Sequence, residues 1–243
     1  LRESLGGFVV TDRKADLVVD IIERQAIMPE AASGDSRSAV EVCMKKGEAL
    51  FMVRSPAERM LGRFDPKERK AVFFNYADIW LEDYIRAFLM AVFQLFLFTQ
   101  NSFLIHACGI KKDKKGYLFP GKSGSGKTTI TSLWPGADIL SDEFVCLRKE
   151  KGSFFMYSTP WKALGQDKAE LKKIIFPKKS GKLRIKKVRA ALAVGEILPN
   201  IIYAFYDKDI FNKVLDTLYE VIKKVNCYEM HFSLDSEFWR EVA

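Results

Sequence analysis

The first third of the chain places its hydrophobic residues in short runs separated by polar turns. These runs are rich in Val, Ile, Phe and Met and cover residues 7–12, 16–22, 39–44, 49–54 and 71–76. Short runs of this kind, bounded by turn residues such as those at 45–48 and 65–67, are typical of β-strands joined by hairpins. The pattern therefore predicts an antiparallel, meander-like β region over residues 1–79, interrupted by a polar, mobile loop at residues 29–38.

A long apolar segment separates that region from the rest of the chain. Residues 81–99 contain no Gly or Pro and are apolar on nearly every side beyond Arg86, which predicts a buried, Phe-rich core helix. Strands are then expected at residues 103–110, 116–119, 139–140, 144–147, 154–157 and 228–234, and helices at residues 128–133, 186–198 and 209–225. We expect two parts, a β-rich subdomain over residues 1–79 and a mixed α/β domain over residues 80–243.

The composition is that of a folded protein with a basic surface. Of the 243 residues, 48% are hydrophobic and 29% are charged, so the chain can bury a sizeable core, and a disordered or fibrous protein is excluded. Lysine and arginine number 39 against 31 acidic residues. The resulting net charge of +8 favours anionic partners such as nucleotides, acidic proteins or nucleic acid.

The cysteines and the apolar runs indicate the cellular compartment in which the protein works. The four cysteines are far apart in sequence and the chain has two histidines, so neither a disulfide framework nor a zinc site is expected. The longest apolar run, residues 87–98, is interrupted by Gln94 and is shorter than the roughly 20 residues that cross a bilayer. The first residues show no secretory signal. We therefore expect a cytoplasmic protein without a membrane span.

The sharpest motif is the sequence GKSGSGKT at residues 121–128, which fits the P-loop (Walker A) pattern GxxxxGK[ST] and follows a predicted strand. Glycines let the backbone N–H groups turn around an anion, the lysine neutralises β and γ phosphates, and the hydroxyl is a ligand for Mg²⁺. A turn without a ligand is disfavoured because strand, lysine, hydroxyl and helix coincide. The predicted residues for binding ATP are Gly121, Lys122, Ser123, Gly124, Ser125, Gly126, Lys127, Thr128 and Thr129.

Two acids and a histidine are the candidates for chemistry beside this loop. Asp142 and Glu143 end a short apolar strand fifteen residues after the loop lysine, where a general base or a magnesium ligand is needed. We assign Asp142 as the base and Thr128, Asp142 and Glu143 as the metal ligands, with a surface Asp–Glu pair as the alternative. His106 lies fifteen residues before the loop and either reaches the phosphates or is a packed core histidine.

These motifs resemble the HPr kinase/phosphorylase family and its related serine kinases, whose P-loop core is similar to that of ATP-dependent phosphoenolpyruvate carboxykinase. The resemblance rests on IHA at 105–107, the loop at 121–128, SDE at 141–143 and STPW at 158–161, with a weaker likeness at 227–239. It implies a P-loop kinase core with a mixed sheet and flanking helices, His106 close to the phosphates, and Asp142 as the base towards a serine hydroxyl. The family usually has a second Asp where Glu143 stands, and its C-terminal phosphorolysis signature has no counterpart here.

The function favoured is therefore an ATP- and Mg²⁺-dependent kinase that phosphorylates a hydroxyl on a protein, peptide or small molecule, with catalytic residues Asp142, His106 and Lys127. A GTPase is disfavoured because no NKxD motif occurs, and an ABC-type ATPase because no LSGGQ-like segment occurs. A non-catalytic nucleotide-binding protein and a carboxykinase-like enzyme remain as alternatives. The acceptor, the donor preference and the oligomeric state are left open.

A basic segment between residues 162 and 189 carries eleven Lys or Arg against two acids. Few aromatic residues accompany it, which disfavours single-stranded nucleic acid. The two readings are a solvated charged loop and a mobile flap that docks an acidic or phosphorylated acceptor. In the second reading, Arg184 or Arg189 supplies a cation to the transferred phosphoryl group.

Overall fold

The computed structural model describes residues 15–24, 40–53, 59–76, 81–122, 124–161, 167–203, 207–233 and 237–242. These residues group into two compact units. The N-terminal unit holds the described residues before Gln100 together with Tyr203, Asp207 and Lys208, and the C-terminal unit holds the others. The sequence pattern predicted a division between residues 79 and 80, whereas the helix that follows groups with the N-terminal strands.

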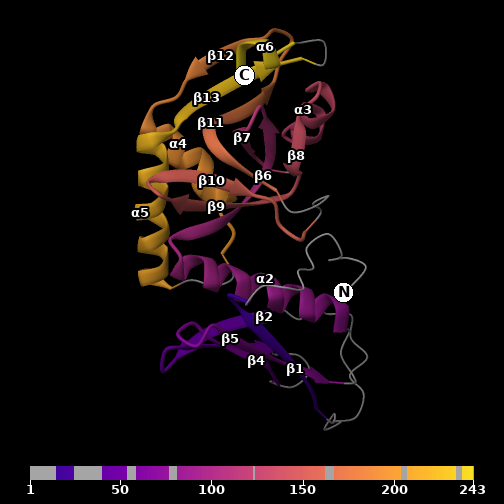
Figure 1. The fold of residues 1–243 in the computed structure, drawn as a ribbon, viewed down its shortest axis with the longest axis vertical. Helices are drawn as coiled ribbons and strands as arrows, with labels where there is room; N and C mark the ends of the chain where they lie inside the picture. Colours follow the sequence, from indigo (N-terminus) through magenta and orange to yellow (C-terminus); the bar gives the residue numbers. More distant parts are fainter. Residues whose placement is uncertain are drawn as a thin grey trace. The chain divides into compact units, whose positions relative to one another are not determined.

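The N-terminal unit contains a five-stranded sheet in the order β1-β5-β4-β3-β2 (Figure 1). Its strands are β1 (Val18–Arg24), β2 (Val40–Lys45), β3 (Glu48–Val53), β4 (Arg59–Asp65) and β5 (Lys70–Tyr76). Four of them form the expected antiparallel meander, but β1 pairs with β5 in parallel, so the all-antiparallel prediction was wrong for this strand. Strand direction depends on the path of the connecting chain, which alternation within a strand does not report. The expected strand at 7–12 and loop at 29–38 lie outside the described residues.

Helix α2 (Leu81–Thr99) packs on this sheet and confirms the predicted core helix. Phe88 is fully buried, and its ring centroid lies 4.7 Å from that of Phe51 and 5.1 Å from that of Phe73. Gly62 on β4 makes room for it, since a Cβ there would lie 2.6 Å from the Phe88 ring. The hydrophobic pattern did not predict β4, because its run is broken by this glycine and by charged residues.

The C-terminal unit is built on a mixed sheet in the order β10-β9-β6-β7-β11-β13-β12, with β8 also paired to β6. Its strands are β6 (Ser102–Lys112), β7 (Lys115–Pro120), β8 (Asp138–Ser141), β9 (Phe144–Glu150), β10 (Ser153–Tyr157), β11 (Lys168–Lys179), β12 (Arg184–Lys187) and β13 (Asn226–Phe232). The protein is therefore a mixed α/β protein. The central strands β7, β11 and β13 are parallel, so their carboxyl ends meet at one edge of the sheet.

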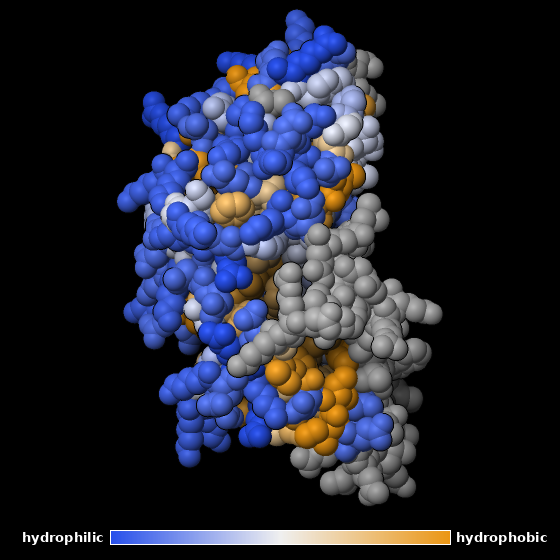
Figure 2. Space-filling model, viewed as in Figure 1, coloured by the Kyte–Doolittle hydropathy of each residue, from blue (hydrophilic) through white to orange (hydrophobic). Residues whose placement is uncertain are grey.

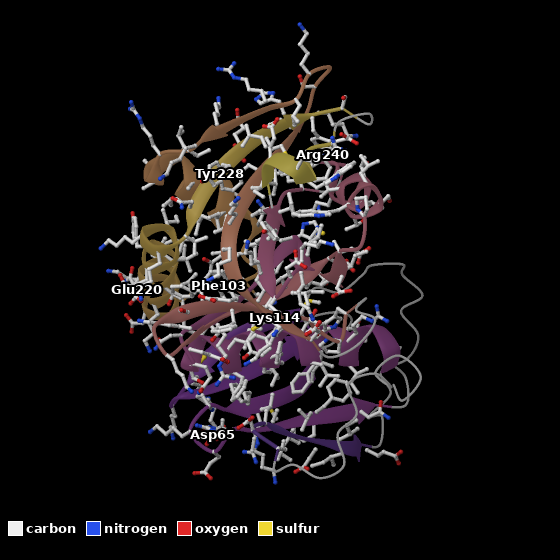
Figure 3. The ribbon with its side chains drawn as sticks, turned by 45° about the horizontal axis from the view of Figure 1, so that its top comes forward. Asp65, Phe103, Lys114, Glu220, Tyr228 and Arg240 are labelled. Atoms are coloured by element: carbon white, nitrogen blue, oxygen red, sulfur yellow. The ribbon has the colours of Figure 1, made fainter. Side chains whose placement is uncertain are left out.

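Four α-helices and one 3₁₀ turn of the described residues accompany this sheet. They are α3 (Lys127–Leu133), α4 (Ala190–Ile197), the 3₁₀ turn η2 (Leu198–Asn200), α5 (Lys208–Lys224) and α6 (Trp239–Val242). Ile130 of α3 belongs to a core cluster with Trp134, Ile175, Met230 and Phe238. Helices α3 and α5 lie at opposite sides of this unit in Figure 1. Figure 3 labels Glu220 on α5, which pairs with Lys149 of β9 at 2.5 Å.

The basic segment is part of the sheet. Residues 168–179 form β11, the strand between β7 and β13, and its Phe176 and Pro177 are buried. Residues 184–187 form β12 instead of the start of the predicted helix 186–198, because they pair with β13; α4 begins only at Ala190. The expected loop conformation and the mobility of the flap were therefore wrong for these residues, while docking of an acceptor on this segment stays a prediction. Residues 162–166 lie outside the described part. Lysines that alternate with buried apolar residues mark an amphipathic strand.

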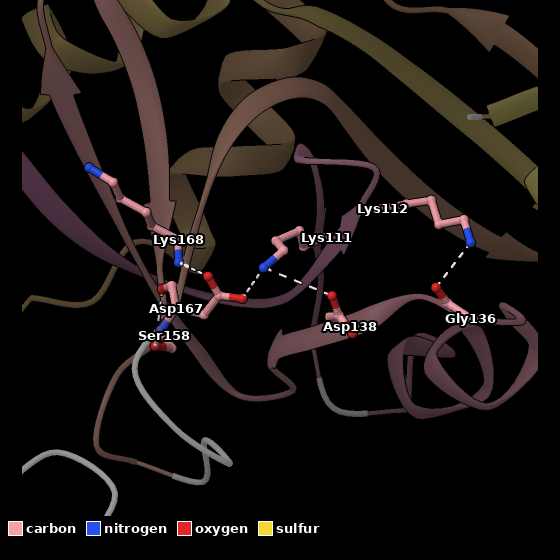
Figure 4. Close-up of polar contacts among 7 residues, drawn as sticks. All are labelled: Lys111, Lys112, Gly136, Asp138, Ser158, Asp167 and Lys168. Atoms are coloured by element: carbon pink, nitrogen blue, oxygen red, sulfur yellow. Dashed lines mark hydrogen bonds and ion pairs between the residues drawn. The ribbon is translucent and has the colours of Figure 1, made fainter.

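A polar network fixes the edge of this sheet opposite the carboxyl ends of β7 and β11 (Figure 4). Lys111 near the end of β6 pairs with Asp167 just before β11, and its Nζ also lies 3.9 Å from Asp138 of β8. The backbone N–H of Asp167 donates to Ser158 Oγ at 2.9 Å. The hydrogen bond from Lys111 to Asp167 raises the pKa of that lysine. These contacts join three strands and leave the other edge open for a site.

The surface is mostly polar over the C-terminal unit in the view of Figure 2, and hydrophobic side chains gather over the N-terminal sheet. On strand β1, the side chains of Val18, Ile21 and Ile22 are each between 43% and 50% exposed. Among the described helices, none combines the length and the hydropathy that a bilayer crossing requires.

Candidate functional site

The glycine loop, residues 121–128, leaves the buried end of β7 and enters α3. Gly126 stands at the N-terminal end of that helix with φ at 100°, a left-handed conformation that favours glycine. A Cβ at Gly126 would also lie 2.8 Å from the Phe232 ring of β13. The backbone N–H of Ile130 donates to Gly126 O at 3.0 Å. Strain and close packing therefore both require glycine here, which holds the helix N-terminus near the carboxyl edge of the sheet.

The beginning of the loop is equally tight. A Cβ at Gly121 would lie 2.6 Å from Ser125 Oγ, so a larger residue would displace the Ser125 side chain. Ser125 Oγ is buried and has no hydrogen-bond partner among the described residues. The N–H of Ser125 donates to Lys122 O at 3.2 Å, which closes the turn. The predicted binding residue Ser123 lies outside the described residues.

Lys127 is the charged centre of the loop and is only 7% exposed. Its ammonium donates to Gly121 O at 2.5 Å and to Lys122 O at 2.9 Å. An ammonium has three N–H donors, so one remains for an anion. Burial lowers the pKa of Lys127, and nearby acidic groups, Asp142 and Glu143 among them, partly oppose that shift. An anion in the loop would relieve the cost of burying this charge.

The acidic turn is held against β6. β8 ends at Ser141 and β9 begins at Phe144, and both strands pair with the same edge of β6. Asp142 and Glu143 form the turn between them, and the N–H of Ala107 on β6 donates to Glu143 O at 3.0 Å. The side chain of Asp142 is exposed and that of Glu143 is half-buried. The turn thus offers one accessible carboxylate at a fixed place.

The side chain of Ser141 stabilises this turn by hydrogen bonds. It is completely buried, and its Oγ accepts hydrogen bonds from the N–H groups of Glu143 at 3.3 Å and of Phe144 at 3.2 Å. A serine that bonds to the backbone two and three residues later stabilises a tight turn. The serine in SDE therefore positions the two acids that follow it.

The glycine loop lies on the other side of β6. β7 pairs with the opposite edge of that strand, and the N–H of Gly121 donates to His106 O at 3.5 Å. Neighbouring strands are about 4.8 Å apart, so the loop and the acidic turn, one strand away on either side of β6, are separated by roughly 10 Å of backbone. Residues from both line one cavity. His106 between them is half-buried, with its ring centroid 5.8 Å from that of Phe144.

A cavity of about 370 Å³, called here the phosphate cavity, joins these parts. Its lining consists of His106, Gly124, Gly126, Lys127, Thr128, Thr129, Asp142, Glu143 and Lys179. The structure thus brings together the three predicted catalytic residues and the three predicted metal ligands. Gly121, Lys122 and Ser125 instead line a neighbouring cavity, together with Gly124.

Lys179 is the residue of this cavity that the sequence did not point to. It ends β11, whose parallel pairing brings it to the same edge as the glycine loop. Its Cε would lie 3.8 Å from a Cβ at Gly126, and its ammonium has no ion-pair partner within the described ranges. The suggested cations Arg184 and Arg189 do not line the cavity. Recognising residues 168–179 as a strand parallel to β7 would have pointed to Lys179.

The oxygen donors in this cavity suit a magnesium ion only if a bound phosphate supplies further oxygen ligands. The oxygen atoms of Thr128, Asp142 and Glu143 are the hard donors that Mg²⁺ prefers. In the described part of the chain, no three His, Cys, Asp or Glu side chains converge to hold a metal by themselves. Mg²⁺ is commonly bound through one or two carboxylates together with phosphate and water oxygens, and this donor set suits that arrangement.

The buried thiol beside the site is not a candidate nucleophile. Cys108 on β6 is completely buried, and this burial, with a smaller contribution from Asp142, raises the pKa of its thiol. A thiol is reactive only as the thiolate. Cys108 therefore serves packing in the core cluster below the loop.

Comparisons with known proteins add little to this geometry. No protein-family model matches the chain, and no curated protein matches it. Among solved structures, it is similar to the HPr(Ser) kinase/phosphatase from Coxiella burnetii, with a TM-score of 0.30 and 11% sequence identity, over 53% of this chain and 84% of that one. The function is therefore inferred from this chain's own residues.

Proposed function

We propose that the protein is a phosphotransferase that uses Mg²⁺ and ATP to phosphorylate a hydroxyl group. The observation that carries the proposal is the phosphate cavity, where the buried Lys127, the helix N-terminus and Asp142 meet. Phosphoryl transfer needs a polyphosphate cradle, neutralisation of charge and a base near the γ phosphate. The sequence resemblance to HPr-kinase-like serine kinases supports the same reaction class.

Each residue has a role in this proposal. The loop amides and the third N–H of Lys127 bind the β and γ phosphates. Thr128 and Glu143 would hold Mg²⁺, and Asp142 would also contact the ion. The charge of the ion would stabilise the negative charge on the transferred phosphoryl group. Asp142 accepts the proton of the acceptor hydroxyl as the new O–P bond forms and the bond to ADP breaks. His106 lies beside the transferred phosphoryl group, where its ring donates a hydrogen bond.

The proposal is tested by incubating the protein with γ-labelled ATP, Mg²⁺ and a host-cell lysate. We expect a labelled phosphate ester that forms with the wild-type chain and forms neither in the lysate alone nor with Lys127→Ala. Release of labelled inorganic phosphate alone would indicate an ATPase, and binding without turnover would indicate a non-catalytic nucleotide-binding protein. Either outcome would contradict the kinase proposal.

Replacing Lys179 tests whether this lysine contributes to phosphoryl transfer. We expect Lys179→Met to lower kcat roughly tenfold to a hundredfold with a small change in KM for ATP, because a cation beside the phosphate chain stabilises the negative charge that develops on the ADP leaving group in the transition state. The matched control is Lys172→Met, since Lys172 lies on the same strand, pairs with Glu170 at 2.6 Å and lines neither the phosphate cavity nor the neighbouring cavity. Equal kcat values for the two variants would remove Lys179 from the mechanism.

The affinity for polyphosphate is expected to fall at alkaline pH. Burial holds the pKa of Lys127 below the ordinary 10.5, so the ammonium loses its proton, and its attraction for an anion, earlier than an exposed lysine does as the pH rises. A bound anion favours the protonated form, so binding in that range takes up protons. Calorimetry in buffers of different ionisation enthalpy measures this uptake. Constant affinity and no uptake up to pH 10.5 would contradict the assignment of Lys127.

A further inference from the structure

A second cavity of about 650 Å³ adjoins the phosphate cavity. Gly124 and Lys179 line both cavities. The second one is bounded by the first residues of the glycine loop on one side and by α4 and η2 on the other. Residues 201–202 fix that side, because Ile201 forms a bridge with Ile105 of β6 and the N–H of Ile202 donates to Leu104 O at 3.0 Å. The walls of the second cavity are thus held in place by backbone contacts within the C-terminal unit.

The position of Asp142 and Glu143 indicates how the phosphate donor is oriented. Asp142 and Glu143 line the phosphate cavity and not the second one. An acceptor hydroxyl must reach Asp142, so the phosphate that is transferred lies at the end of the cavity marked by the acids. The remainder of the donor must leave the phosphate cavity elsewhere. The border shared through Gly124 and Lys179 leads into the second cavity.

The lining of the second cavity suits a flat, apolar group with polar edges. Phe176, Pro177 and Pro199 supply apolar surface, and charged groups surround it, namely Lys122, Lys179 and the ion pair of Lys178 with Glu196. Asn200 is 8% exposed and uses its Nδ2 to donate to Glu196 O at 2.8 Å, which leaves its Oδ1 as an acceptor. Cavities of roughly 300–1,000 Å³ with mostly apolar walls and a few fixed polar groups are typical of small-molecule sites.

We propose that the second cavity holds the nucleoside of the phosphate donor, with Asn200 at the polar edge of the base. This inference rests on the proposed function, and it makes the donor a nucleoside triphosphate in preference to an inorganic polyphosphate. An inorganic chain fills only the phosphate cavity. A nucleotide gains additional affinity from the apolar walls of the second cavity.

Gly195 offers a test that leaves the phosphate cavity untouched. It lies in α4 and lines the second cavity, and a Cβ at this position meets no atom within 4 Å. Leucine also favours helix more than glycine does, so Gly195→Leu is expected to fold and to fill part of the cavity. Ala191→Leu is the matched control, since Ala191 is exposed on the same helix and does not line the cavity.

The measurement compares two ligands by calorimetry, a non-hydrolysable ATP analogue and tripolyphosphate, each with Mg²⁺. We expect Gly195→Leu to weaken binding of the ATP analogue by about tenfold or more, equivalent to the loss of a well-packed group, and to leave tripolyphosphate within about twofold. Ala191→Leu is expected to match the wild type for both ligands. Gly195→Met replaces Gly195→Leu if the thermal melt shows that the leucine variant is not folded.

The outcomes separate the two proposals. Wild-type affinity of Gly195→Leu for the ATP analogue would overturn the nucleoside assignment and leave the proposed function standing. Equal loss of both ligands would also overturn it, because the cavity would then act on the phosphates. Failure of the wild-type chain to bind either ligand would contradict the proposed function itself.

Discussion

Replacing Lys127 with alanine is expected to abolish binding of ATP. The side chain is buried and already donates two hydrogen bonds to loop carbonyls, so its remaining N–H is held in place for a phosphate oxygen without further loss of side-chain entropy. Charge-assisted hydrogen bonds in a desolvated site are much stronger than those at the surface. A loss of affinity of about a hundredfold or more is expected, measured by calorimetry with a non-hydrolysable ATP analogue.

The control for this experiment must separate binding from folding. Alanine leaves Gly121 O and Lys122 O without their donor, which is expected to cost about 1–3 kcal/mol of unfolding free energy. Thermal unfolding of the free variant measures that part. Lys115→Ala removes an exposed cation at the start of β7 that lines neither cavity, and it is expected to leave ATP affinity within about twofold of the wild type. Tight ATP binding by folded Lys127→Ala would refute the loop as the phosphate site.

Asp142→Asn is expected to keep ATP bound and to lose phosphoryl transfer. Asparagine preserves the size and the turn held by Ser141 but cannot accept the hydroxyl proton. General bases contribute about a hundredfold to ten-thousandfold, so single-turnover transfer to the acceptor should fall within that range. Affinity for the ATP analogue without metal should stay within a few-fold.

The matched control for the base is Asp138→Asn. Asp138 begins the same short strand, is exposed and lies 3.9 Å from Lys111 at the edge away from the loop. Wild-type transfer is expected for this variant. Full activity of Asp142→Asn, or equal losses in both variants, would remove Asp142 from the role of base.

Local patterns predicted the parts of the fold whose shape depends on neighbours in sequence. The apolar run without Gly or Pro became α2 with the predicted bounds, and residues 209–225 became α5. The strand before the glycine loop and the helix after it were also found where expected. These elements are set by hydrophobic periodicity and by backbone hydrogen bonds that close within a few residues.

The pairing of strands that lie far apart along the chain could not be predicted from local patterns. The lysines of β11 gave the segment the composition of a surface loop, yet its apolar residues are buried where it pairs with β7 and β13. Likewise, the parallel pairing of β1 with β5 depends on residues more than forty positions apart. Sheet partners are chosen by the packing of the whole domain, so strand propensity is a weak guide to them.

The sequence by itself predicted the candidate chemistry of this protein: a glycine loop for phosphates, a lysine for an anion, and an Asp–Glu pair at the end of a short strand. These properties reside in side-chain type and short-range backbone geometry. Only the tertiary structure decided that both features flank β6, that Lys179 joins them from β11, and that a second cavity adjoins the first. The physical reason is that such distances follow from strand order and packing across the sheet, which contiguous residues do not encode.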